Sequence, residues 1–137
     1  MGDLSKNFSR REFACPCCGQ AKVRLALVDA LQELRHISGS RILVSSGYRC
    51  AAHNCAVGGV EHSRHLTGQA ADIVIAEMTV LEMASIAPRV KKFREGGMGI
   101  YPSRGFIHVD VRGWRARWGA EWVLRSRCAA VVEAWVM

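Results

Sequence analysis

The chain has 137 residues, half of them apolar, and Lys plus Arg outnumber Asp plus Glu by 19 to 12, for a net charge of +7. This length predicts one domain that buries a core without staples, and no apolar run is long enough to span a membrane. The basic residues are mostly scattered and no nucleic-acid-binding motif accompanies them, so we expect no nucleic-acid partner. The charge either belongs to an ordinary soluble surface or attracts a polyanion.

Residues 1–20 are expected to form an irregular arm anchored by Phe8 and Phe13. The arm holds three of the six cysteines, in the run Cys15-Pro16-Cys17-Cys18-Gly19. In a reducing cytosol such clusters are more often metal ligands than disulfides. The spacing of Cys50 and Cys55, however, is not that of a standard zinc knuckle. A structural zinc, a disulfide and free buried thiols all stay open for the four cysteines concerned, which are Cys15, Cys18, Cys50 and Cys55.

Leucines recur at three- and four-residue steps over residues 24–37, which predicts an amphipathic helix. The run at 38–40, Ser-Gly-Ser, ends it. An alternating pattern over 41–46 predicts a short strand, and 51–56 a helical turn. The apolar run at 73–75 is typical of a buried strand.

A capping-box signature, Thr79-Val80-Leu81-Glu82, opens a further helix. Two strands, at 98–101 and 105–111, are expected to form a hairpin around Pro102-Ser103-Arg104. A last helix is expected from Glu121, with one stripe that packs on the core, made of Leu124, Cys128, Val131 and Trp135.

These elements predict the α+β class, a small antiparallel sheet with packed helices in a single domain. Its parts would be the N-terminal arm (1–20), a catalytic core (24–118) and a C-terminal helix (121–137).

Several separated motifs carry residue types that bind metals or substrates. The decad from Ser63 to Asp72 contains His65, and Phe106-Ile107-His108-Val109-Asp110 contains a second imidazole. Three further motifs are Ser46-Gly47-Tyr48-Arg49, Val57-Gly58-Gly59 and Gly96-Gly97-Met98-Gly99-Ile100-Tyr101-Pro102. Together and in this order, from roughly residue 13 to residue 118, they resemble the zinc D-Ala-D-Ala peptidases of the M15 group. That group shares its fold with the hedgehog signalling domain.

The resemblance implies an enzyme that hydrolyses peptide bonds in peptidoglycan stem peptides, as a carboxypeptidase or an endopeptidase. It implies one catalytic Zn²⁺ with three protein ligands and an open fourth position, where the pKa of bound water falls toward ~7. The ligands would be His65, Asp72 and His108.

The resemblance also implies roles for residues around the metal. Arg49 would grip a substrate carbonyl or carboxylate in a bidentate fork that Lys could not copy; a plain surface charge is the alternative. Tyr101 and Ser63 are further candidates for substrate contact. Ser63 is expected to orient backbone or a ligand rather than to act as a nucleophile.

The general base is the open question of the site. Several branches of the family have an acidic residue three positions before the last histidine ligand, where this chain has Gly105. Asp110 shares a strand face with His108, about 7 Å away along the backbone, and is our candidate. The alternative role for Asp110 is to orient a ligand imidazole. Glu61 and His62 are lesser candidates for the base.

We expect a monomer whose partners are peptidoglycan peptides. Residues 1–6 show no hydrophobic segment typical of a secretory signal, so we expect cytoplasmic synthesis and action on the cell wall after release, as for a phage or prophage lysis enzyme. Two alternatives are a non-catalytic zinc-containing binding module, which Gly105 favours, and a structural component of a phage particle.

Overall fold

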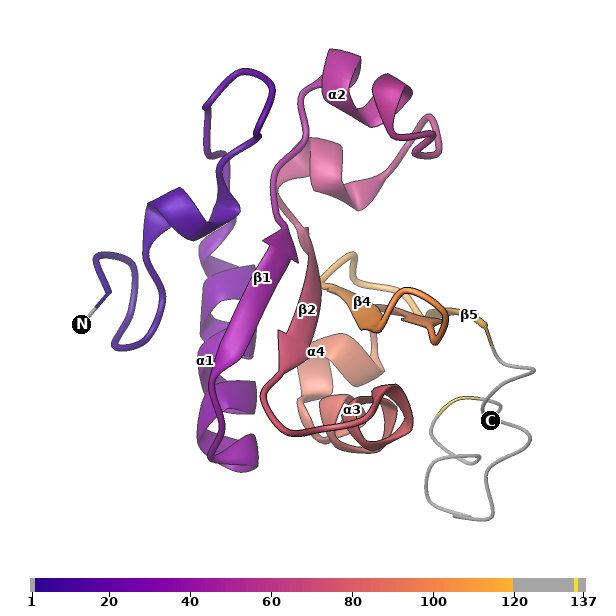
Figure 1. Ribbon diagram of the computed structural model, residues 1–137. Coiled ribbons are helices and arrows are strands. Elements are labelled where there is room, and N and C mark those ends of the chain that lie inside the picture. Colours follow the sequence, from indigo (N-terminus) through magenta and orange to yellow (C-terminus); the bar gives the residue numbers. More distant parts are fainter. Residues whose placement is uncertain (1, 120–134, 136–137) are drawn as a thin grey trace.

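A five-stranded sheet in the order β1-β2-β4-β3-β5 organises the fold (Figure 1). The structure is a computed structural model that describes residues 2–119 and 135. The strands are β1 (Ile42–Ser46), β2 (Ala70–Ile75), β3 (Gly97–Tyr101), β4 (Phe106–Asp110) and β5 (Ala116–Trp118). The α-helices are α1 (Leu25–Ser38), α2 (Ala51–Ala56), α3 (Val80–Ile86) and α4 (Lys91–Arg94). Three 3-10 turns complete the described elements: η1 (Arg10–Phe13), η2 (Arg64–Thr67) and η3 (Ala87–Arg89).

The α+β class is confirmed, and the sheet is antiparallel across four of its five strands. The β1–β2, β2–β4 and β3–β4 pairs are all antiparallel. The fifth strand, β5, pairs in parallel with β3 at the edge, so the sheet is mixed. This three-residue strand was not predicted, because so short a segment carries no readable alternation.

Local signals in the sequence account for the boundaries of two helices. The helix predicted at 24–37 is α1, and it ends at Gly39 in the left-handed conformation, with φ of 66°. The predicted capping box opens α3, where the Glu82 backbone N–H donates to Thr79 Oγ1 and the Thr79 N–H donates to Glu82 Oε1. The predicted hairpin is the β3–β4 pair.

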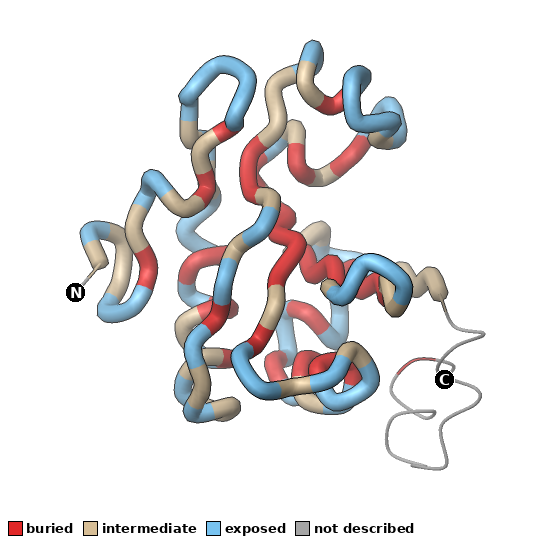
Figure 2. The backbone as a smooth tube through the Cα atoms, viewed as in Figure 1, coloured by how far each residue is buried: buried red, intermediate tan, exposed pale blue. Residues whose placement is uncertain are grey.

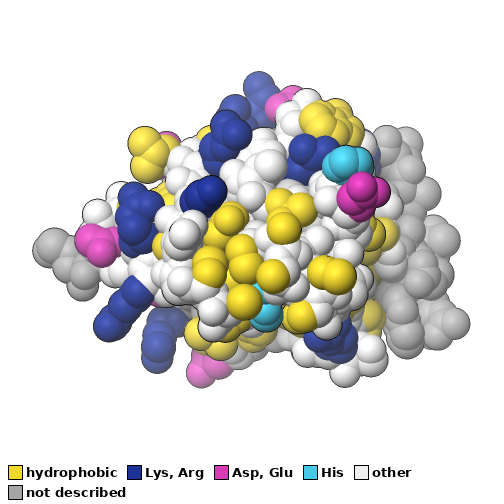
Figure 3. Space-filling view, turned by 90° about the horizontal axis from the view of Figure 1, so that it is seen from above, with side chains coloured by type: hydrophobic (Ala, Val, Ile, Leu, Met, Phe, Trp, Pro, Cys, Tyr) yellow, Lys and Arg dark blue, Asp and Glu magenta, His cyan; other side chains and the backbone are white. Residues whose placement is uncertain are grey.

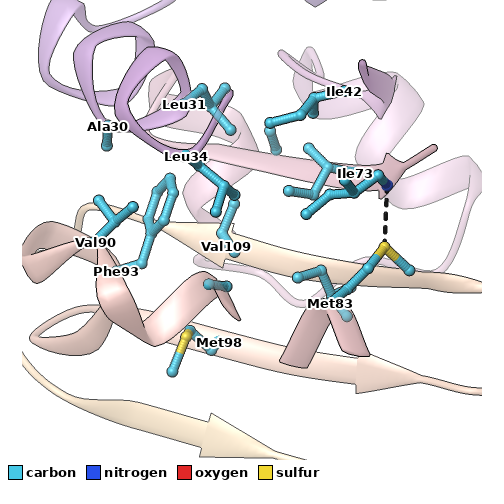
Figure 4. Close-up of a cluster of buried hydrophobic side chains, with 14 of the residues drawn as sticks. Ala30, Leu31, Leu34, Ile42, Ile73, Met83, Val90, Phe93, Met98 and Val109 are labelled. Atoms are coloured by element: carbon cyan, nitrogen blue, oxygen red, sulfur yellow. Dashed lines mark hydrogen bonds between the residues drawn. The ribbon is translucent and has the colours of Figure 1, made fainter. Parts of the chain in front are cut away.

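The two faces of the sheet carry different sets of side chains, because successive side chains on a strand point to opposite faces. On one face α1, α3 and α4 cover a core that includes Ile73, Ile107 and Val109, all fully buried (Figure 4). Residues of the opposite parity on the same strands, Asp72 and His108, therefore lie on the other face. The tube view shows buried backbone running through β2, while α2 and the turn after it are largely exposed (Figure 2).

Both ends of the chain contribute to the packing. The arm's predicted anchors Phe8 and Phe13 belong to the core, each 1% exposed. The predicted helix from residue 121 lies outside the described residues except for Trp135. The Trp135 side chain is buried in the core, and its indole N–H donates to the Ala84 carbonyl at 2.8 Å. Among the described residues no helix combines the length and apolar character needed to cross a bilayer.

Candidate active site

Two neighbouring strands and one turn bring His65, Asp72 and His108 together. In the β2–β4 register Asp72 is the direct cross-strand partner of His108. The turn η2, which precedes β2, supplies His65. All three side chains are buried, and one donor atom from each lies within 4.8 Å of the other two.

Hydrogen bonds set which nitrogen of each imidazole faces the cluster. His65 Nδ1 lies 2.7 Å from the Gly47 carbonyl, so this nitrogen carries the proton and Nε2 presents its lone pair to the cluster. His108 Nε2 lies 2.7 Å from Asp110 Oδ2, which leaves Nδ1 as its free nitrogen. The donor set is therefore His65 Nε2, His108 Nδ1 and Asp72 Oδ1.

The spacing of these donors fits a tetrahedral zinc ion. Asp72 Oδ1 lies 3.3 Å from His65 Nε2 and 3.1 Å from His108 Nδ1. Nitrogen and oxygen ligands about 2.0–2.1 Å from a tetrahedral zinc are about 3.3 Å apart. Two imidazoles and a carboxylate are also a ligand type typical of catalytic zinc.

Arg49 is held beside this cluster by three different acceptors. Its Nη2 pairs with Asp72 Oδ2 at 3.2 Å, opposite the oxygen that faces the histidines. Its Nε donates to Ser46 Oγ at 3.2 Å and its Nη1 to Asn54 Oδ1 at 3.3 Å. The guanidinium thus fixes the orientation of the Asp72 carboxylate. These bonds use three of the five N–H groups of Arg49, and two remain for other acceptors.

Asp110 is fully buried and surrounded by donors. Oδ2 accepts from His108 Nε2 and Arg112 Nη2, each at 2.7 Å. Oδ1 accepts from the backbone N–H of Gly97 at 2.9 Å and from Arg112 Nε at 2.9 Å. The carboxylate therefore orients the His108 ring from behind, on the side away from Asp72.

Neighbouring side chains outweigh burial in setting the charge of the two carboxylates, Asp72 and Asp110. Burial raises the pKa of Asp72, but the His108 and His65 imidazoles beside it hold that pKa well below its ordinary value. Burial likewise raises the pKa of Asp110, and the bonds from His108 and Arg112 lower it well below the ordinary range. Both carboxylates are therefore ionised at neutral pH, which favours a bound cation.

Two glycines of β3 leave the room that the site needs. A Cβ on Gly97 would lie 2.2 Å from Asp110 Oδ2, and one on Gly99 would lie 2.0 Å from Trp118 Nε1. Trp118 in turn lies against the His108 ring, with 4.8 Å between ring centroids. Glycine is thus needed at these two positions because Asp110 and Trp118, which both contact His108, lie close to the backbone of β3.

A cleft of about 480 Å³ opens over the donor cluster. Its lining includes four arginines and three aromatic side chains: Arg49, Arg64, Arg104, Arg112, Tyr101, Phe106 and Trp118. On the face in Figure 3, basic side chains surround a central group of apolar side chains. Of the four arginines, Arg49 pairs with Asp72 and Arg112 with Asp110.

The other predicted site residues lie in or near this cleft. Tyr101 lines it, and its hydroxyl accepts from Trp118 Nε1 at 2.7 Å. Ser63 is buried and accepts from the His65 N–H at 3.2 Å. His62 lines the cleft, whereas Glu61 is exposed and is not part of its lining. Arg112 and Trp118 were not predicted as site residues, because no local sequence pattern marks either of them.

Gly105 has a conformational role in the hairpin between β3 and β4. Its φ is +76°, in the left-handed region that favours glycine. Its N–H closes the turn on the Tyr101 carbonyl at 2.9 Å. An acidic side chain at this position would strain the turn.

The structure brings together three of the four predicted cysteines. Cys15, Cys18 and Cys50 form a second group of potential ligands, whereas Cys55 is exposed and outside it. Burial opposes ionisation of Cys15, but N–H donors from the backbone of Cys50, Cys18 and Cys17 outweigh it and lower the Cys15 pKa to about 6.

The chain is similar in sequence to known peptidases. The family described as Peptidase M15 matches residues 6–110. The chain is 36% identical over 87 residues to the "Probable peptidoglycan L,D-endopeptidase MepK" of Haemophilus influenzae, covering 58% of this chain and 45% of that protein. It is 32% identical over 92 residues to the "Peptidoglycan L,D-endopeptidase MepK" of Escherichia coli K12, covering 62% and 49%. The chain thus spans about half the length of the curated relatives it matches.

Proposed function

The chain belongs to the peptidase M15 family, and from this premise we propose that it hydrolyses peptide bonds in peptidoglycan stem peptides with one catalytic Zn²⁺. The observation that carries the proposal is the buried donor set of His65, Asp72 and His108 at the base of an arginine-lined cleft. The names of the relatives support peptidoglycan as the substrate and favour an endopeptidase over a carboxypeptidase.

The residues present suit a zinc site with an open position. His65 Nε2, His108 Nδ1 and Asp72 Oδ1 would hold the ion. When bound in such a site, zinc acts as a Lewis acid on a peptide carbonyl and makes water a nucleophile at neutral pH. Asp110 and the Gly47 carbonyl would keep both imidazoles in the tautomers that ligation requires.

Asp110 therefore has a positioning role in this proposal, rather than that of the general base. Its two oxygens already accept from His108, Arg112 and Gly97. Its side chain is fully buried, so it has no open path to a substrate in the cleft. Of the two roles that the sequence left open, orientation of His108 fits these contacts better.

We assign proton transfer to His62, which lines the cleft and is exposed to it. A neutral imidazole has one nitrogen that accepts a proton and one that donates it. Among the described residues that line the cleft, the other two histidines belong to the buried donor set. A ring nitrogen of His62 would take a proton from the attacking water and return it to the leaving amine.

The charge of the cleft suits an anionic peptide. Arg49 would donate its remaining N–H groups to a substrate carbonyl or carboxylate while holding Asp72. Arg104 and Arg112 line the same cleft. Stem peptides of peptidoglycan carry free carboxylates, which these guanidiniums would pair with.

The test is digestion of purified peptidoglycan by the zinc-treated chain, with products identified by mass spectrometry. We expect released peptides from the parent chain and from His36→Ala, an exposed control on α1. We expect none from His65→Ala, which should also lose zinc. Binding to peptidoglycan without released peptides from the parent chain would instead favour the non-catalytic module that Gly105 suggested.

We further propose that the protein is a monomer and that it acts on the cell wall after release, as a phage lysis enzyme does. Analytical ultracentrifugation of the pure chain tests the first of these.

A further inference from the structure

A second group of metal-binding side chains lies outside the catalytic cluster. Cys15 and Cys18 follow η1, and Cys50 is the N-cap residue of α2. Their sulfur atoms all lie within 4.8 Å of one another. The chain thus brings together thiols that are more than thirty positions apart in the sequence.

The spacing of the sulfurs matches joint ligation of a metal. Cys15 Sγ lies 3.7 Å from Cys50 Sγ. Two thiolates about 2.3 Å from a tetrahedral zinc lie about 3.8 Å apart, whereas the sulfurs of a disulfide are about 2.05 Å apart. The Cys-x-x-Cys spacing of Cys15 and Cys18 is also that of structural zinc sites.

Backbone donors point at these sulfurs, as they would at thiolates. The Cys50 N–H donates to Cys15 Sγ at 3.5 Å, and the His53 N–H donates to Cys50 Sγ at 3.5 Å. The loop itself is closed by the Cys15 N–H, which donates to the Gln20 carbonyl at 2.7 Å. The site is therefore preformed by main chain on both sides.

A fourth thiol is at hand. Cys17 directly precedes Cys18 in the same loop, and its sulfur lies outside the group of three that are within 4.8 Å of one another. Structural zinc sites are closed by four ligands. Cys17 is exposed, as a ligand on the outer side of a surface loop would be before the metal binds.

We propose that Cys15, Cys17, Cys18 and Cys50 bind a structural Zn²⁺ that fastens the N-terminal arm to the segment at 47–50. This segment serves the catalytic site directly, because the Gly47 carbonyl accepts from His65 and Arg49 pairs with Asp72. The arm already contacts it, since the Tyr48 N–H donates to the Phe13 carbonyl at 2.8 Å. The second metal thus stabilises the support of two catalytic ligands without touching substrate.

The experiment measures metal in the full chain carrying His65→Ala and His108→Ala, so that the catalytic site contributes none. Elemental analysis should find about one zinc ion per chain. Cobalt(II) in its place should give a thiolate-to-cobalt charge-transfer band. In the same background Cys50→Ser should lose both signals. Cys17→Ser should lose its zinc to a chelator that does not remove zinc from the parent. Cys55→Ser, on the same helix but outside the cluster, is the matched control and should keep both.

Three results would overturn the site. The first is a His65→Ala, His108→Ala chain with neither zinc nor the cobalt band, a measurement that needs no cysteine variant to fold. The second is Cys50→Ser or Cys17→Ser with unchanged zinc retention. The third is a thiol titration after chelation and denaturation that finds two fewer than the six cysteines of the chain, which indicates a disulfide. None of these depends on peptidoglycan hydrolysis, so the proposed function is tested separately.

Discussion

Replacement of Asp110 by Asn separates the two roles that this residue could have. The amide has nearly the same size and keeps one oxygen, which can still accept from the Gly97 N–H. It replaces the other oxygen with an NH₂ group. That group would face His108 Nε2–H and Arg112 Nη2, two donors that now lie 2.7 Å from Asp110 Oδ2.

The expected loss follows from these two contacts. The His108 ring either loses its acceptor or moves its proton to Nδ1, the nitrogen that faces Asp72. Loss of such an orienting partner typically costs 10–100-fold in metal affinity, or about 1.4–2.7 kcal/mol of binding free energy. The buried hydrogen bonds to Arg112 should add a loss of about 1.5–3 kcal/mol in the free energy of unfolding.

Zinc affinity is measured by competition with a chromophoric chelator, and peptidoglycan hydrolysis is followed at low and at saturating zinc. The positioning role predicts that saturating zinc restores much of the rate of Asp110→Asn. Asp29→Asn, an exposed change on α1, serves as the control and should match the parent chain.

Two outcomes would refute the reasoning. Normal zinc affinity with a rate at least ~10²-fold lower at every zinc concentration would make Asp110 the general base. Normal affinity and normal rate would leave the carboxylate without either role.

Arg49→Lys keeps a charge near Asp72 but loses the planar fork, so kcat/KM should fall more than tenfold with the fold intact by circular dichroism; unchanged turnover would reduce Arg49 to a structural residue. His62→Ala should lower kcat by ~10²-fold or more with zinc content unchanged, and a rate near that of the parent would move proton transfer elsewhere. Gly99→Ala should push Trp118 off the His108 ring, seen as a shift in its fluorescence, and lower zinc affinity; a spectrum like the parent's would contradict the close approach. Trp135→Ala should cost ~3–5 kcal/mol in urea unfolding, and a loss below 1 kcal/mol would argue against burial of its ring in the core.

Much of the fold could be predicted because its signals are local. The recurrence of leucines over α1, the capping box at Thr79 and Glu82, and the turn of the β3–β4 hairpin each arise from neighbours within a few positions. The parallel pairing of β5 with β3 could not be predicted, since it depends on a distant partner. The residues of the donor set could be named because their motifs together resemble those of the M15 group; a His and an Asp seven positions apart also occur often by chance.

The sequence by itself determined which residue types are available: two imidazoles and a carboxylate for one site, and a run of thiols for another. Only the tertiary structure decided what each one does. The Gly97 N–H and Arg112 decide that the Asp110 carboxylate is hydrogen-bonded rather than available to a substrate. The orientation of α2 decides that Cys50, and not Cys55, lies beside Cys15 and Cys18. The physical reason is that hydrogen bonding and ligation require contact within a few ångströms. The register of β2 on β4 and the packing of the arm against the segment at 47–50 set those contacts, and neither can be read from spacing along the chain.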